Sequence, residues 1–101
     1  MATTAKALFR GAATTGLTTT LYTVPASTST IVTNIVVTNE AAAAATFDIS
    51  LDGQKLFKAV TIAANTTVVI DLKQFLATTK IIAGGASATT VGFHISGVEI
   101  V

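Results

Sequence analysis

Apolar and polar side chains alternate along most of this chain, and short stretches of turn-forming residues separate the alternating runs. A period of two places successive side chains on opposite faces of a β-strand, whereas an α-helix would show a period of 3.6 residues. No segment carries a convincing helical stripe. The pattern therefore predicts an all-β chain.

The clearest predicted strand covers Thr30 to Asn39. One of its faces carries Ile31, Thr33, Ile35 and Val37, and the other carries Val32, Asn34, Val36 and Thr38. Branched apolar residues occur on both faces, which is typical of a strand in the middle of a sheet. We therefore expect this strand to have a neighbour on each side.

The most specific local pattern is a β-hairpin around Asp52-Gly53. Residues 46–52 alternate, with Phe47, Ile49 and Leu51 expected toward the core and Asp48, Ser50 and Asp52 toward solvent. Asp-Gly readily adopts the two positive φ angles of a type I′ turn, which joins antiparallel strands. Residues 54–60 are the predicted returning strand.

Weaker runs of the same kind predict further strands at Leu17 to Val24, Thr66 to Leu72, Thr79 to Ala83 and Ala88 to Val101. Lys73 to Thr79 is expected to be a connection or a single helical turn, and Gly84-Gly85 a break. Gly97 is expected to mark a bulge in the last strand. Residues 1–16 form either an N-terminal arm or an edge strand, and residues 17–101 form the β-sandwich domain.

About eight short strands at intervals of about ten residues predict a single antiparallel β-sandwich of the jelly-roll or immunoglobulin-like type. A chain of 101 residues has the size of one domain. The order of the strands within the sheets cannot be deduced from this pattern.

The composition adds an expectation about the surface. Only 11% of the residues are charged, against about 25% in an ordinary soluble domain, and threonine and alanine make up more than a third of the chain. Exposed sheet edges are normally protected by lysine, proline or bulges, yet Thr18 to Val24 and Thr30 to Asn39 contain no lysine. We therefore expect a homo-oligomer or a component of a larger assembly.

Several functions are not expected. The net charge is +1 and the six basic residues are scattered, so no nucleic-acid partner is predicted. The longest apolar run, Ala41 to Ala45, is far shorter than the ~18 residues that a membrane helix needs. The N-terminal residues lack the apolar stretch of a secretory signal, so we expect synthesis in the cytoplasm. Cysteine is absent, which excludes disulfides and thiolate chemistry.

Candidate chemistry is sparse. His94 is the single histidine, and no sequence signature supplies it with an orienting carboxylate and a nucleophile. Asp48, Ser50, Asp52 and Gly53 match the opening of a calcium loop, but Ala59 stands where the bidentate glutamate is required. We therefore predict no catalytic residue, no metal site and no cofactor.

Aromatic residues are also few. The chain has no tryptophan, and we expect most of its phenylalanines to be core residues: Phe47, Phe57, Phe75 and Phe93. Tyr22 is the best candidate for an exposed ring that could contact a sugar. The favoured interpretation is an aromatic side chain at a packed interface with its hydroxyl group hydrogen-bonded.

Several segments of the chain carry a resemblance to a known group of proteins. They are Leu21 to Ala26, Thr30 to Asn39, Phe47 to Gly53, Ile62 to Thr66 and His94 to Glu99. Together they resemble recurrent stretches in small virion structural proteins of tailed bacteriophages, over roughly residues 17–101. The resemblance implies a small β-sandwich protein of the phage particle without enzymatic activity.

Such proteins include head decoration or cement proteins, and similar domains occur in tails, collars and fibres. The preferred hypothesis is a decoration protein, with a trimer favoured, that binds the major capsid protein or other virion proteins and bridges capsid subunits. The N-terminal segment is expected to order on docking, with Leu8 and Phe9 as anchors and Arg10 at the rim; Tyr22 is a further candidate interface residue. The alternatives are a tail, collar or fibre-associated protein, and a host adhesin that binds glycans.

Overall fold

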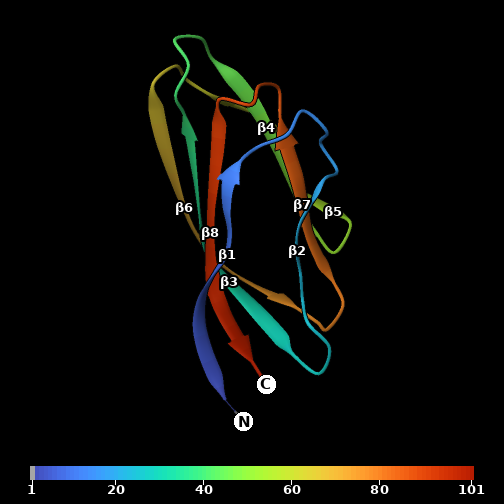
Figure 1. Cartoon of the computed structure of the whole chain (residues 1–101). Coiled ribbons are helices and arrows are strands. Elements are labelled where there is room, and N and C mark those ends of the chain that lie inside the picture. The colour runs from blue at the N-terminus through green and yellow to red at the C-terminus, as the bar shows by residue number, and fades with distance from the viewer. Residues whose placement is uncertain (1) are drawn as a thin grey trace.

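The computed structural model describes residues 2–101 and contains eight strands and no helix within that range (Figure 1). The strands are β1 (Thr3–Ala12), β2 (Thr20–Thr23), β3 (Ser29–Asn39), β4 (Ala45–Leu51), β5 (Gln54–Ile62), β6 (Thr66–Leu76), β7 (Ile81–Ala86) and β8 (Val91–Ile100). The predicted all-β class is confirmed.

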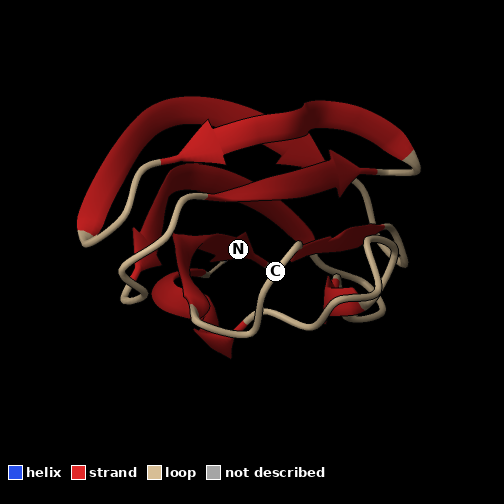
Figure 2. Ribbon diagram, turned by 90° about the horizontal axis from the view of Figure 1, so that it is seen from above, coloured by secondary structure: helices blue, strands red, loops and turns tan. Residues whose placement is uncertain are grey.

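The strands form two four-stranded antiparallel sheets, in the orders β1-β8-β3-β6 and β2-β7-β4-β5. The first strand pairs with the last, the second with the seventh, the third with the sixth and the fourth with the fifth. This is the pairing of one long hairpin that has been rolled up. That pairing is the jelly-roll topology, so of the two predicted sandwich types the structure has the jelly roll. The view in Figure 2 shows the strands wrapped around the interior.

The core lies between the two sheets and is built from alternate residues of the strands. Its largest fully buried side chains include Phe47 of β4 and Phe93 of β8, whose ring centroids are 6.1 Å apart in an edge-to-face arrangement. Such aromatic pairs add to the free energy gained by burial alone. Because β4 and β8 belong to different sheets, this contact joins the two layers.

Both strands that neighbour β8 in the first sheet, β1 and β3, contain a bulge. Leu8 is an extra residue in β1 and Thr33 an extra residue in β3, and both lie beside residues 95–97 of β8. The prediction that β8 itself bulges at Gly97 is wrong, because β8 pairs without interruption. Gly97 instead permits close approach, since a Cβ there would overlap the Ile31 carbonyl oxygen and lie 2.8 Å from Leu8 Cδ1.

The bulge at Thr33 changes which residues of β3 face the core. Strict alternation would place Val32 and Ile35 on opposite faces, yet both are fully buried together with Val37. A bulge adds one residue and thereby reverses the phase of the alternation. The predicted central position of this strand is confirmed, because β3 lies between β8 and β6.

The predicted hairpin is confirmed at its turn. Asp52 and Gly53 have φ angles of 54° and 77°, which are those of a type I′ turn. On β4, however, Asp48 and Ser50 are only 5% and 7% exposed, although we expected both in solvent. The Asp48 carboxylate accepts hydrogen bonds from Lys55 Nζ at 2.8 Å and from the Ala59 N–H at 3.0 Å, so irregular strand β5 covers it.

Three further expectations are corrected. Gly84-Gly85 is no break but lies inside β7, where a Cβ on either glycine would overlap a carbonyl oxygen, that of Asp48 or that of Gly16. Most of the expected connection after Leu72 is strand, because β6 continues to Leu76. Phe75, expected in the core, is 66% exposed on β6.

Candidate interaction surface

The predicted anchors of the N-terminal segment lie in strand β1. This strand forms one edge of its sheet and pairs with β8 from Thr3 to Ala12. The bulge at Leu8 turns that residue and Phe9 inward, so Leu8 is 7% exposed in the core and Phe9 packs against it. The segment is therefore an edge strand of the sandwich, and Leu8 is a core residue that is not available as a docking anchor.

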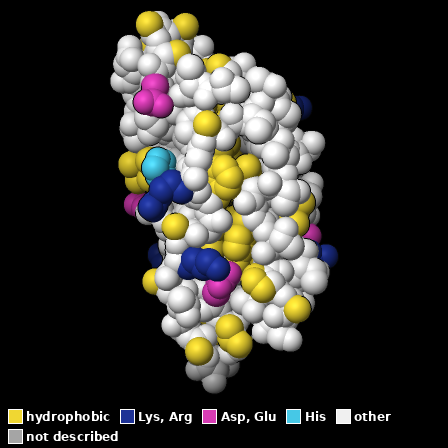
Figure 3. All heavy atoms as spheres, in the orientation of Figure 1, with side chains coloured by type: hydrophobic (Ala, Val, Ile, Leu, Met, Phe, Trp, Pro, Cys, Tyr) yellow, Lys and Arg dark blue, Asp and Glu magenta, His cyan; other side chains and the backbone are white. Residues whose placement is uncertain are grey.

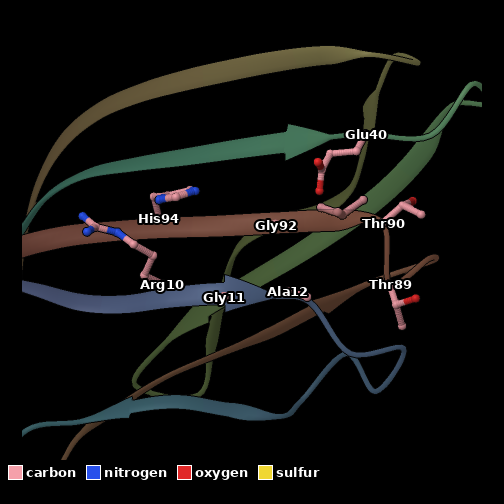
Figure 4. A pocket seen from close by; sticks show the side chains of 9 residues that line it. Arg10, Gly11, Ala12, Glu40, Thr89, Thr90, Gly92 and His94 are labelled. Carbon is pink, nitrogen blue, oxygen red and sulfur yellow. The ribbon is translucent and has the colours of Figure 1, made fainter.

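Arg10 is exposed and lies opposite His94 on the outer face of the same sheet. The two side chains border an open hollow of about 190 Å³, which Glu40, Thr89 and Thr90 also line. Figure 4 shows Arg10 and His94 on neighbouring strands, with Glu40 approaching from the loop that follows β3. His94 is exposed and lies between the buried Phe93 and Ile95, as expected for alternate residues of a strand.

Tyr22 is half-buried and joins the two sheets through its hydroxyl group. The Tyr22 Oη donates a hydrogen bond of 2.5 Å to Glu99 Oε2 and lies 2.9 Å from Thr30 Oγ1. Lys6 Nζ lies 3.3 Å from the other carboxylate oxygen of Glu99. Because β2 and β8 belong to different sheets, the network closes the sandwich at this end. The expected hydrogen bonding of the Tyr22 hydroxyl group is confirmed, while a place for this ring at an interface with another protein stays a prediction.

The same contacts alter proton affinities. Burial, followed by the hydrogen bond to Glu99, raises the pKa of Tyr22 to about 12. The hydrogen bond from Tyr22, supported by Lys6, holds the pKa of Glu99 below its ordinary value. On β4, the hydrogen bond from Lys55, followed by that from the Ala59 N–H, lowers the pKa of Asp48.

The oxygens of the partial calcium pattern are used within the fold. Asp48 is paired with Lys55, and Asp52 lies at the tip of its hairpin with Oδ1 3.6 Å from Lys80 Nζ. Among residues 2–101 there is no group of three or more His, Cys, Asp or Glu side chains that could hold a metal ion. Over the same residues, no helix has the length and apolar character needed to cross a membrane.

Exposed hydrophobic side chains are concentrated on one lateral side of the sandwich. Strands β5 and β6, which end their respective sheets there, carry five of the seven large exposed ones in the described chain: Leu56, Val60, Val68, Val69 and Phe75. On the face seen in Figure 3, the charged side chains form small isolated groups within an otherwise uncharged surface. Sequence reasoning missed this surface because an edge strand and a central strand show the same alternation.

The strand register places two of these residues, Val69 and Phe75, in rows that cross the outer face of the sheet β1-β8-β3-β6. One row joins Ala5, Val98, Ile31 and Phe75, one residue from each strand, and contains no polar side chain. The row Arg10-His94-Val36-Val69 lies further along the strands and combines a basic end with an apolar end.

Between these two rows lies Ala7-Ser96-Asn34-Asp71. In it, Asn34 Oδ1 is buried and has no hydrogen-bond partner among the described residues. We call the three rows together the outer face.

Comparison with protein families, with curated proteins and with solved structures gives no match for this chain. Its function is therefore inferred from the fold and from the outer face.

Proposed function

We propose that this protein is a structural component of a bacteriophage particle, and specifically a decoration protein that binds the assembled head and bridges neighbouring capsid subunits. The major capsid protein would be its principal partner. The proposal combines the sequence resemblance with the character of the molecular surface.

One observation carries the proposal: an uncharged apolar row crosses all four strands of the outer face and ends at the exposed Phe75. Protein interfaces are depleted of charged residues at their centres and enriched in aromatic ones. Contiguous exposed apolar surface generally marks an interaction site. A surface of this kind is typical of a protein that functions while packed against other proteins.

The fold supports the proposal by analogy only. Jelly rolls recur in viral capsid proteins, but they also occur in lectins and in cupins, and a fold hosts many functions. Tyr22 gives no support to the glycan-binding alternative, because its ring is half-buried and its hydroxyl is bonded to Glu99 and Thr30.

The proposed mechanism is thermodynamic. A protein that binds the assembled shell, and not the free subunits, stabilises the shell by RT ln(1 + [L]/Kd) for each site. Many modest apolar contacts and backbone hydrogen bonds suffice for this, and no chemical step is needed. The outer face and the free strand edges are the surfaces that would make these contacts.

A density map of the intact particle that carries this chain tests the proposal. We expect jelly-roll density in many copies over the head shell, at positions where capsid subunits meet. Few copies at a collar, tail or fibre would instead establish the tail-associated alternative. Absence of the chain from purified particles would overturn the proposal.

A substitution in the apolar row tests the surface itself. Val98→Lys places a charge at the middle of the row, and we expect it to abolish rebinding to particles stripped of the protein. Thr18→Lys, in the exposed turn before β2 and away from the outer face, is the matched control and should rebind normally. Equal rebinding of the two folded variants would show that the outer face does not contact the shell.

A further inference from the structure

We propose that β6 pairs with β6 of a second copy, antiparallel and with the two-fold axis at Leu72, so that the sheet β1-β8-β3-β6 continues into the partner subunit. This pairing rests on the proposed function and deepens it, because it gives the homo-oligomer expected from the sequence a specific contact. It names both the strand through which copies meet and the register in which they pair.

The edge of β6 is free to accept a strand. Within residues 2–101, β6 pairs only with β3 and forms the border of its sheet, as its position beside β3 in Figure 1 shows. It is eleven residues long, contains no proline and has one lysine. A long edge strand with so little protection is a template for pairing with another chain.

The side chains of β6 keep a regular alternation. Val69 lies opposite Val36, Asp71 opposite Asn34 and Phe75 opposite Ile31, which places all three on the outer face. Thr67 lies opposite Thr38 and also points outward. Leu72 and Lys73 fall in the register shift between Asp71 and Gln74, where the period of two and the exposure of Lys73 place the Lys73 side chain on the outer face. Val69 and Phe75, at 63% and 66% exposure, are the most exposed large hydrophobic side chains within any strand of the described chain.

Only one register of self-pairing satisfies these side chains. Directly opposite residues of an antiparallel pair point to the same face and contact each other. With the axis at Leu72, Asp71 lies opposite the partner's Lys73, and Val69 lies opposite the partner's Phe75. By symmetry each of these contacts forms twice.

The neighbouring registers are unfavourable. An axis at Asp71 places two aspartates opposite each other, and an axis at Lys73 places two lysines opposite each other. An axis at Ile70 places Asp71 opposite the partner's Val69. Like charges directly opposite each other destabilise a strand pair, so the charges of β6 select the axis at Leu72.

The pairing also supplies contacts that the single chain lacks. Within the described residues neither Asp71 nor Lys73 makes an ion pair or a side-chain hydrogen bond. The two-fold contact is closed, because the same strand is used by both subunits and no edge of β6 remains. A trimer, favoured from the sequence, would need a second and different contact.

Charge exchange tests the pairing. Asp71→Lys places lysines opposite each other and Lys73→Asp places aspartates opposite each other, so each variant should be monomeric at concentrations where the wild-type chain is dimeric. The double variant D71K/K73D restores opposite charges and should dimerise again. An equimolar mixture of the two single variants should form a heterodimer, because every opposed pair is then complementary.

Sedimentation equilibrium measures these states, and circular dichroism with urea unfolding shows that each variant is folded. A monomeric wild-type chain at its highest soluble concentration would overturn the inference. So would single variants that dimerise as well as the wild type, or a mixture that shows no preference for the heterodimer.

Cysteine substitution reads the register directly, because the chain has no cysteine of its own. Opposed Cα atoms at the axis would be about 4.5–5.5 Å apart, within disulfide range, so Leu72→Cys should form a linked dimer on oxidation. Val69→Cys is the matched control, since the two Val69 positions would be about 20 Å apart.

The double variant V69C/F75C should link again, and it covers the case in which Leu72→Cys disturbs the core. Efficient linkage of Val69→Cys alone, or none in V69C/F75C, would refute the register. A chain that is monomeric yet occupies the particle would refute β6 pairing and leave the proposed function standing. A chain that dimerises in this register but is absent from particles would support β6 pairing and overturn the proposed function.

Discussion

The two lateral sides of the sandwich differ in how their strand edges are treated. On the side of β1 and β2, the chain closes itself: Leu8 and Ala13 are buried, and the loop after β1 accepts hydrogen bonds from β7. These are Gly84 N–H to Thr19 O and Ala86 N–H to Thr14 O, each 2.9 Å long. On the side of β5 and β6, five large hydrophobic side chains are exposed, and among residues 2–101 strand β6 pairs only with β3.

The difference shows that a charge-poor composition has two uses in one molecule. On the closed side, threonines supply internal hydrogen bonds, such as that of 2.7 Å between the hydroxyl groups of Thr14 and Thr19. On the open side, the same low charge leaves an edge that a partner can cover at little desolvation cost. The closed side therefore contributes to the stability of the single chain, and the association that we propose would use the open side.

Substitution of Gly85 tests the closed side with the largest expected effect. A Cβ at this position would overlap the Gly16 carbonyl oxygen and lie 2.7 Å from that of Thr14, so the loop would have to move. We expect Gly85→Ala to lower the free energy of unfolding by about 3 kcal/mol or to prevent folding. Urea unfolding measures the change.

Gly92→Ala is the matched control for Gly85, because the nearest atom to a Cβ there is Gly11 O at 3.7 Å, an ordinary contact distance. We expect it to change stability by no more than about 0.5 kcal/mol. Equal effects of the two substitutions would mean that the loop after β1 does not hold the edge of β7 rigidly.

Truncation of one apolar side chain on each side compares the two directly. Leu8 is 7% exposed, and Leu8→Ala should destabilise the monomer by about 2–4 kcal/mol. Phe75 is 66% exposed, and Phe75→Ala should alter monomer stability by no more than about 0.5 kcal/mol while weakening self-association. Denaturant unfolding at low protein concentration separates the two effects. A loss of monomer stability in Phe75→Ala as large as in Leu8→Ala would contradict the division.

The features that the sequence predicted correctly are local ones. The turn at Asp52-Gly53 needs two positive φ angles from two adjacent residues, so the dipeptide alone indicates it. The central position of β3 follows from apolar residues on both of its faces. In each case the information lies within a few residues of the feature.

The features that escaped prediction depend on strands far apart in the chain. The bulge that buries Leu8 forms against β8, and Gly85 is glycine because the loop near Gly16 passes over it. Tyr22 finds its acceptor in Glu99, 77 residues away. Phe75 is exposed because it points to the outer face from the edge strand β6, and the alternation alone does not reveal the order of the strands.

Titration of Tyr22 tests the hydrogen bond between Tyr22 and Glu99, which joins the two sheets on the closed side. The expected effect on stability is smaller than that of the Gly85 and Leu8 substitutions. Tyr22 is the single tyrosine, so tyrosinate absorbance reports on it alone. Its folded pKa is raised from 10.0 to about 12, so the stability that its neutral form contributes is complete below pH 10 and is lost as the pH rises toward 12. We expect Glu99→Gln to lower this pKa only in part, because burial is the larger cause. A tyrosine that titrates near pH 10 in the folded protein would contradict the closed arrangement.

The dependence of stability on pH in acid tests the same hydrogen bond through the ionisation of Glu99. Its pKa is held below the ordinary value of 4.5, so its stabilising contribution is complete above that pH and is lost as the pH falls through the folded pKa. Tyr22→Phe removes the largest cause of this shift and should cost about 1–2 kcal/mol at neutral pH. The pKa of Asp48 is also lowered, so both proteins should lose stability in acid, but the variant should lose less. Parallel stability curves for the two proteins below pH 4.5 would show that the Tyr22–Glu99 bond does not hold the two sheets together on the closed side.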